Sequence, residues 1–327
     1  MIIQESSLFL ELTPQQLKKI IKSALNENII NYRLMEGGMF NTTYLIQTDK
    51  TGDVILSLGP VNRHLIMPFE HKCMETEVMI FELMHKNGIP ASEVLAFDNS
   101  KTIVDRDYSI IKYIKSCMIL DAEKFYPGKM PYIMEQFGIA LKKFHSVKAN
   151  KFGRVPDVLA GKGFEKNSEF LKSEVKDWIS VAKNTEFFTQ SFFNDVTEVF
   201  NRFSDILDEI TQAHLVHGDV ARTNALVHTQ KAKPELAAII DPERGFFGDP
   251  QFDIAMIDYF IDDDFIKGYG DIYNCDEHTK IRRMLYKLLR RMFDSYVWGA
   301  EYNQPDNMQE TRSFIYETTE KLLKGEF

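Results

Sequence analysis

The sequence predicts an α+β protein, with a small N-terminal lobe built on an antiparallel five-stranded sheet and a larger, mainly helical C-terminal lobe. Short alternating segments separated by glycine-containing turns occupy the first third of the chain and indicate strands. After about Ser116, apolar residues recur at helical spacing instead. A chain of 327 residues has room for about two domains or lobes, and we expect these to cover residues 1–114 and 115–327.

Local signals justify the elements of the N-terminal lobe. Thr13 and Gln16 form a capping box at the start of the first helix. Alternation and turn residues predict five strands, at residues 31–36, 42–48, 53–58, 94–97 and 108–114. An apolar stripe predicts a second helix over residues 73–85.

The C-terminal lobe is expected to follow a hinge near residues 112–116. Residues 131–145 carry a strongly amphipathic helical pattern. Further helices are predicted at residues 170–182, 192–210 and 281–298, and two short strands at 225–228 and 237–240.

The composition argues against several classes of function. The formal charge of 39 − 48 = −9 disfavours nucleic acid and anionic membranes as partners, because the field of the protein repels polyanions. Three scattered cysteines without a CxxC motif indicate neither a disulfide framework nor a zinc site. With no basic leader and no run of about 18 apolar residues, we expect a cytoplasmic protein.

Two segments carry the chemical signal. The first reads LVHGDVARTN over residues 215–224, so that Asn224 follows Asp219 by five positions. In the second, over residues 239–255, an apolar strand ends in Asp241 and a glycine-containing turn leads into a helix. Either segment alone would be better explained by turn-rich loops with capping Asp and Asn residues. Together they suit phosphoryl transfer, with Asp219 as the base and Asn224 and Asp241 as oxygen ligands for Mg²⁺.

This combination of motifs resembles the aminoglycoside phosphotransferase / choline kinase superfamily, which are small-molecule kinases with a protein-kinase-like fold. The similarity extends from about Tyr32 to about Ile261. The resemblance implies a two-lobed fold, Mg²⁺ as cofactor, ATP or GTP as phosphate donor and the hydroxyl of a small molecule as acceptor. It does not indicate the oligomeric state.

The resemblance also implies roles for residues around the nucleotide. Gly38 and Asn41 would lie in the hairpin that covers the nucleotide. Glu77 would orient a basic residue that contacts the phosphates of the nucleotide. The adenine would meet the backbone of the hinge at Lys112, Tyr113 and Ile114. Behind the site, Asp253 would brace the catalytic loop, and His217 would serve as a hydrogen-bonding scaffold.

One departure from the family pattern concerns the third strand. The family places Lys or Arg about where Ser57 falls, and serine cannot replace a cation. A charge-assisted hydrogen bond is worth about 1.5–3 kcal/mol, so its loss matters. Three interpretations stay open. Arg63, His64 or Lys72 supplies the charge, the enzyme works with a weakened clamp, or the protein binds nucleotide with impaired catalysis.

The acceptor is the least defined part. Glu243 and the carboxylates Asp258, Asp262 and Asp263 are candidate substrate contacts, because a run of carboxylates attracts ammonium groups. A solvated helix end explains the last three equally well. An aminoglycoside-like antibiotic is the leading acceptor, and choline, homoserine, a methylthio-sugar or a glycated amine are the alternatives.

Overall fold

Antiparallel pairing builds the N-terminal sheet, whose strand order is β1-β2-β3-β5-β4. The computed structural model describes residues 6–36 and 39–327, so Gly38 lies outside the described residues. The strands are β1 (Ile29–Leu34), β2 (Thr42–Thr48), β3 (Asp53–Leu58), β4 (Val94–Asp98) and β5 (Tyr108–Lys112). The predicted five-stranded antiparallel sheet is therefore confirmed.

Strand alternation gives the sheet two different faces. On β3, Val54, Leu56 and Leu58 are buried against helix α1 (Pro14–Leu25), which covers the outer face. Ile55 and Ser57 point to the opposite face, because successive side chains of a strand alternate. That inner face looks toward the C-terminal lobe.

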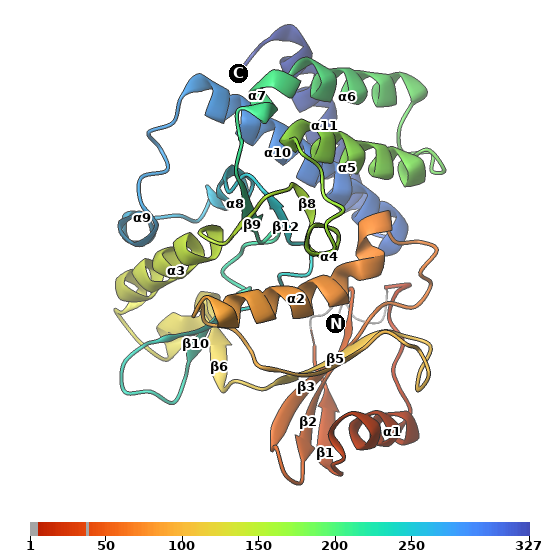
Figure 1. The fold of residues 1–327 in the computed structure, drawn as a ribbon, viewed down its shortest axis with the longest axis vertical. Helices are drawn as coiled ribbons and strands as arrows, with labels where there is room; N and C mark the ends of the chain where they lie inside the picture. The colour runs from red at the N-terminus through yellow and green to blue at the C-terminus, as the bar shows by residue number, and fades with distance from the viewer. Residues whose placement is uncertain (1–5, 37–38) are drawn as a thin grey trace.

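Helix α2 (Cys73–Lys86) lies between the sheet and the C-terminal helices and is preceded by a 3-10 turn, η1 (Pro68–Lys72) (Figure 1). Its apolar residues Ile80, Phe81 and Met84 are buried in the core of the C-terminal lobe. The helix therefore ties the two lobes together along one side.

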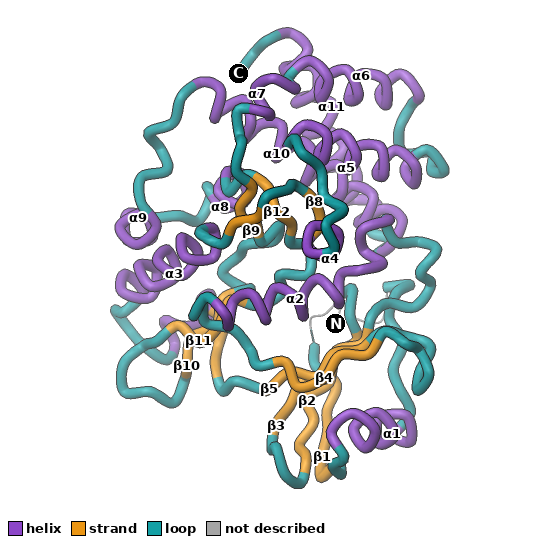
Figure 2. Tube along the Cα trace, in the orientation of Figure 1, coloured by secondary structure: helices purple, strands orange, loops and turns teal. Residues whose placement is uncertain are grey.

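Helices dominate the C-terminal lobe, and short strands hold its loops (Figure 2). The helices are α3 (Met130–His145), α4 (Val155–Leu159), α5 (Asn167–Ala182), α6 (Gln190–Arg202), α7 (Ser204–Asp208), α8 (Gln251–Ile257), α9 (Asp263–Tyr269), α10 (Glu277–Tyr296) and α11 (Pro305–Lys324), with a 3-10 turn η2 (Ile119–Lys124) and a π turn η3 (Val297–Glu301). The strands are β6 (Ser116–Met118), β7 (Lys148–Ala149), β8 (Gly153–Arg154), β9 (Ala213–Val216), β10 (Ala225–His228), β11 (Leu236–Ile239) and β12 (Phe246–Gly248). They form two small sheets, of order β11-β10-β6 and β7-β9-β12-β8.

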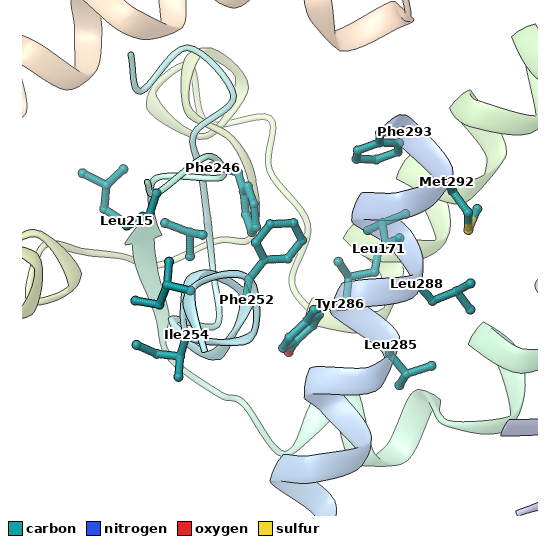
Figure 3. Close-up of a cluster of buried hydrophobic side chains, with 14 of the residues drawn as sticks. Leu171, Leu215, Phe246, Phe252, Ile254, Leu285, Tyr286, Leu288, Met292 and Phe293 are labelled. Atoms are coloured by element: carbon teal, nitrogen blue, oxygen red, sulfur yellow. The ribbon is translucent and has the colours of Figure 1, made fainter. Parts of the chain in front are cut away.

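The core of this lobe joins α10 to the strands that carry the loops. Figure 3 shows Tyr286 and Phe293 of α10 facing Phe252 of α8 and Phe246 of β12. The rings of Phe246 and Phe252 pack edge to face, 5.0 Å apart. Apolar packing thus fixes α10 beside the loops that follow β9 and β11.

The structure differs from the sequence-based expectations most in three places, besides shifts of one to three residues at the ends of other elements, such as β1, β5 and α5. The helix predicted over 192–210 is two helices, because the backbone turns at Phe203, the C-cap of α6. The helix predicted over 281–298 begins earlier, at the Asp276 cap, and ends in a π turn. The four-stranded sheet was not predicted, because its strands have only two to four residues and show no periodicity. Within the described residues, no helix has both the length and the apolar character that crossing a membrane requires.

The contact between α3 and α9 generates a stability prediction. A Cβ atom on Gly138 would lie 2.3 Å from the backbone oxygen of Phe265 and 2.8 Å from the backbone nitrogen of Tyr269. We expect Gly138→Ala to destabilise the protein by about 1–3 kcal/mol in urea unfolding, although alanine is the better helix former by about 1 kcal/mol. Ile139→Ala, at an exposed position of the same helix, should change little. An increase in stability for Gly138→Ala would show that the two helices do not approach so closely.

Candidate active site

A cleft of about 830 Å³ lies between the inner face of the N-terminal sheet and the C-terminal lobe. Its walls come from β2, β3, α2, the hinge, the loops after β9 and β11, and the end of α10 with the π turn. Asp219, Asp241 and Glu243 line it together, as do Asn41, Glu77 and the three hinge residues Lys112, Tyr113 and Ile114.

Asp253 holds the loop that follows β9. Its Oδ2 accepts the backbone N–H of His217 at 2.7 Å, and its Oδ1 accepts that of Gly218 at 2.9 Å. The ring Nε2 of His145, at the end of α3, lies 2.9 Å from the same carboxylate. Asp253 is fully buried, and the predicted bracing role is confirmed.

His217 links this loop to the next one. The backbone N–H of Asp219 donates to its Nδ1 at 3.2 Å, so its Nε2 carries the proton and donates to the Ile240 carbonyl at 3.0 Å. Burial lowers the pKa of His217, which keeps the ring neutral and suits this pattern. The residue is a scaffold, as predicted.

Gly218 is required where the two loops touch. Its φ of +80° lies in the left-handed region, and an added Cβ would come within 2.6 Å of the Arg244 carbonyl oxygen. Only glycine avoids both problems. The HGD sequence therefore reflects a close approach of backbones.

Asp219 meets a cation from α10. Arg290 Nη2 donates to Asp219 Oδ1 at 2.9 Å. Burial alone would raise the pKa of Asp219, but the charges of Arg290 and Arg244 outweigh it and lower the pKa. The carboxylate is therefore ionised and held in place at neutral pH.

Asn224 and Asp241 follow Asp219 in the chain by 5 and 22 positions, and the fold brings both near it. Asn224 Nδ2 donates to the Asp219 carbonyl at 2.8 Å, which leaves its Oδ1 available as a ligand. Asp241 lines the cleft in a left-handed backbone conformation with φ of 62°. Burial, and next to it the charge of Asp219, raise the pKa of Asp241 to about 6.

This pair fits Mg²⁺ held partly by a nucleotide. The described residues contain no group of three or more His, Cys, Asp or Glu side chains that could hold a metal alone. Mg²⁺ commonly takes one or two protein oxygens and completes its shell with phosphates and water. Asp241 is a half-buried carboxylate that forms no ion pair among the described residues, and the Asn224 amide oxygen next to it provides the second ligand of such a pair.

Glu243 and Asn41 contact each other across the cleft. Asn41 Nδ2, from the turn before β2, donates to Glu243 Oε2 at 2.8 Å. Burial, and then the charges of Asp241 and Glu77, raise the pKa of Glu243 well above its ordinary value. The hydrogen bond joins the two lobes and places a carboxyl group of low charge on the cleft wall.

Ser57 and Glu77 lie where the cation of the third strand was expected. Ser57 lines the cleft, with its Oγ 3.5 Å from Thr43 Oγ1. Glu77 forms no ion pair among the described residues, and burial, followed by the charge of Asp241, raises its pKa to about 8. A neutral Glu77 is what a site without its partner cation would contain.

The three basic candidates do not fill this gap. Arg63 pairs with Asp107 at 2.9 Å, and Lys72 pairs with Asp157 at 2.7 Å. Neither of them lines the cleft, and His64 does not line it either. Of the three interpretations, only a weakened clamp or impaired catalysis stays open.

The hinge presents an unused backbone donor. Lys112 N–H donates to the Glu93 carbonyl at 2.8 Å, and Tyr113 N–H donates to the Asp53 carbonyl at 3.2 Å. The N–H of Ile114 has no hydrogen-bond partner in the described part of the chain. It is the hinge donor that a base could use.

The predicted acidic run lies away from the cleft. Asp258 forms an ion pair with Lys287. Asp262 caps α9 by accepting Phe265 N–H at 2.9 Å, and Asp263 is in the first turn of that helix. None of the three lines the cleft, so we do not carry them into the substrate site.

The sequence-based set omitted the wall formed by α10. Arg290, Asp294 and Trp298 recur every four residues and all line the cleft, and Tyr302 and Arg244 join them. Arg290 Nε donates to Asp294 Oδ1 at 2.8 Å. The signal was present as charged residues at helical spacing within an amphipathic segment.

The raised pKa of Asp241 predicts that its negative charge lowers the stability of the unliganded protein although activity requires the carboxylate. Because its pKa in the folded protein is about 6 and its ordinary value is lower, the folded state loses stability as pH rises from about 4 to 6. We expect Asp241→Asn to stabilise the unliganded protein by roughly 1–3 kcal/mol at pH 8 in urea unfolding, much less at pH 4.5, and to abolish activity. Asp264→Asn, outside the cleft, is the control. Destabilisation by Asp241→Asn at pH 8 would contradict the assignment.

Comparison with known proteins gives the same fold. The structure resembles the aminoglycoside phosphotransferase APH(4)-Ia with a TM-score of 0.66 and 13% identity, covering 94% of this chain and 99% of that one. It also resembles a streptomycin–ATP complex of APH(2")-IIa, with a TM-score of 0.63, 14% identity and coverage of 96% and 99%. An aminoglycoside phosphotransferase homologue from Ralstonia eutropha gives a TM-score of 0.59 and 14% identity, and the match covers 96% of this chain and 99% of that one. The comparison with curated proteins gave no match.

The sequence itself matches a family model. The model describes fructosamine kinase and covers residues 13–313, which is most of the chain. The predicted superfamily and two-lobed kinase-like fold are thereby confirmed. The chain belongs to the fructosamine kinase family and is a phosphotransferase that acts on a hydroxyl group.

Proposed function

We propose that this protein transfers the γ-phosphate of a Mg²⁺–nucleotide to a hydroxyl of a ketosamine, the adduct of a sugar and an amine. The observation that supports the chemistry is that Asp219 and Asp241 line one cleft, while Asn224, which does not itself line it, is hydrogen-bonded to the backbone carbonyl of Asp219. The family match supports the acceptor class, because the matched family is named for fructosamine.

The residues divide the work of such a transfer. Asp219 accepts a hydrogen bond from the acceptor hydroxyl and aims its oxygen at the phosphorus, while Arg290 keeps the carboxylate fixed. A lowered pKa makes Asp219 an orienting group more than a strong base, which suits the loose transition state of phosphoryl transfer. Bound Mg²⁺, held by Asn224 and Asp241, would neutralise charge on the phosphates.

The nucleotide has a place on the hinge side. Ile55 and Ile111 from the sheet and Leu226 from β10 provide apolar walls, and Ile114 N–H is available to the base. The phosphates then run toward Asp241. Nothing in this arrangement separates ATP from GTP as donor.

The opposite wall favours an acceptor with few positive charges. Asp294 already pairs with Arg290 at 2.8 Å and Arg291 at 3.3 Å, and the raised pKa of Glu243 favours its neutral form. A polycation would need more free carboxylates than this wall offers. Trp298 and Tyr302 instead provide aromatic surface, against which the carbon face of a sugar can pack.

An acceptor panel tests the proposal. With Mg²⁺ and ATP or GTP, we expect fructosyl-lysine to give phosphorylated product and nucleoside diphosphate at a higher kcat/KM than kanamycin, hygromycin B or choline. Asp219→Asn should lower kcat about 100-fold or more, measured by diphosphate release and product mass. Asp258→Asn, outside the cleft, should keep full activity. A higher kcat/KM with an aminoglycoside would overturn the acceptor class, and full activity of Asp219→Asn would overturn the mechanism.

A further inference from the structure

Arg244 presents unused hydrogen-bond donors where its side chain lines the cleft. Among the described residues, its side chain donates only to Glu70, at 3.1 Å from Nη2 to Oε1. A guanidinium carries five N–H donors. The Nε and Nη1 atoms of Arg244 have no partner within residues 6–36 and 39–327 but are accessible to solvent. Its side chain is 13% exposed, on the loop between β11 and β12.

The position of this guanidinium is fixed in advance. Glu70 is 3% exposed, and its other oxygen accepts the Met67 N–H at 2.9 Å. Arg154 Nη1 donates to the Arg244 carbonyl at 2.8 Å, and Arg154 is itself paired with Glu174. Little conformational freedom is left for a ligand to remove, which favours binding.

Arg290, the other arginine beside Asp219, has a protein partner at each of its three nitrogen atoms. Its three nitrogen atoms donate to Asp294, to the Gly218 carbonyl and to Asp219. Arg290 therefore positions Asp219, whereas Arg244 remains available to an anion. Arg244 lines the same cleft as Asp219 and Asp241, and its charge acts on both carboxylates.

We propose that Arg244 is a further catalytic residue, which donates hydrogen bonds to the oxygens of the transferring phosphoryl group. It supplies from the C-terminal lobe positive charge that Ser57 cannot supply from β3, and the inference rests on the proposed function. In the step, the bond from the γ-phosphorus to the diphosphate oxygen breaks, and its electron pair stays on the diphosphate. The acceptor oxygen bonds to phosphorus, its proton passes to Asp219 and on to solvent, and Arg244 stays protonated throughout.

The test compares nucleotides that differ by one phosphate. Calorimetric titration of the full chain with Mg²⁺–AMP-PNP and Mg²⁺–ADP needs no acceptor. We expect Arg244→Gln to weaken AMP-PNP binding about tenfold and ADP binding less than threefold. The same substitution should lower kcat by about 10²- to 10³-fold, a smaller effect than loss of the arginine finger has in GTPases. Arg244→Lys, which keeps the charge but not the fork, should fall between wild type and Arg244→Gln.

A control variant and a replacement variant keep the outcomes distinct. Arg291→Gln removes an arginine that is 52% exposed and does not line the cleft, and it should leave both affinities unchanged. If Arg244→Gln unfolds because Glu70 loses its partner, Arg244→Lys replaces it in the titrations. We then expect the affinity for AMP-PNP to fall at least threefold while the affinity for ADP is unchanged. Equal losses for both nucleotides, or a change only in the KM of the acceptor, would overturn the role of Arg244. A wild-type protein that binds neither nucleotide would overturn the proposed function as well.

Discussion

The carboxylate of Asp253 is the constraint on which the catalytic loop depends. It is fully buried, and it accepts two consecutive backbone N–H groups while the ring of His145 lies against it. One side chain from α8 thus fixes the backbone immediately before Asp219 and joins it to α3. Because a buried carboxylate without these donors would be costly, the loop and the brace stabilise each other.

The charges of the cleft follow from a missing cation. The third strand carries serine, and neither Glu77 nor Asp241 has a cationic partner among the described residues. Both line the cleft, and the pKa is raised to about 8 for Glu77 and to about 6 for Asp241. The C-terminal lobe contributes Arg244 and Arg290 beside Asp219, and Lys112 and Lys124, both paired with carboxylates, also line the cleft. Carboxylates and arginines therefore line the same cleft, an arrangement that a magnesium–nucleotide complex would balance.

Long elements and local motifs could be predicted from the sequence, and long-range contacts could not. The strands β2 and β3 have the expected bounds, and the capping box at Thr13 is present. The family resemblance, carried by the two short motifs that contain His217 and Asp253, implied the scaffold and the brace, because the spacing within each motif is fixed. The cleft wall at Arg290 and Asp294 was not predicted, because its position beside Asp219 depends on how α10 packs. The acidic run from Asp258 was misleading for the same reason, because only the fold shows that it lies outside the cleft.

The central claim is that one metal–nucleotide complex is held between Asn224 and Asp241, with its terminal phosphate facing Asp219. A crystal structure of the protein with Mg²⁺ and AMP-PNP tests this most directly. We expect the ion to be coordinated by the side-chain oxygens of Asn224 and Asp241, and the γ-phosphate to lie within reach of a hydroxyl held by Asp219. An ion bound by neither residue, or a nucleotide outside this cleft, would contradict the account.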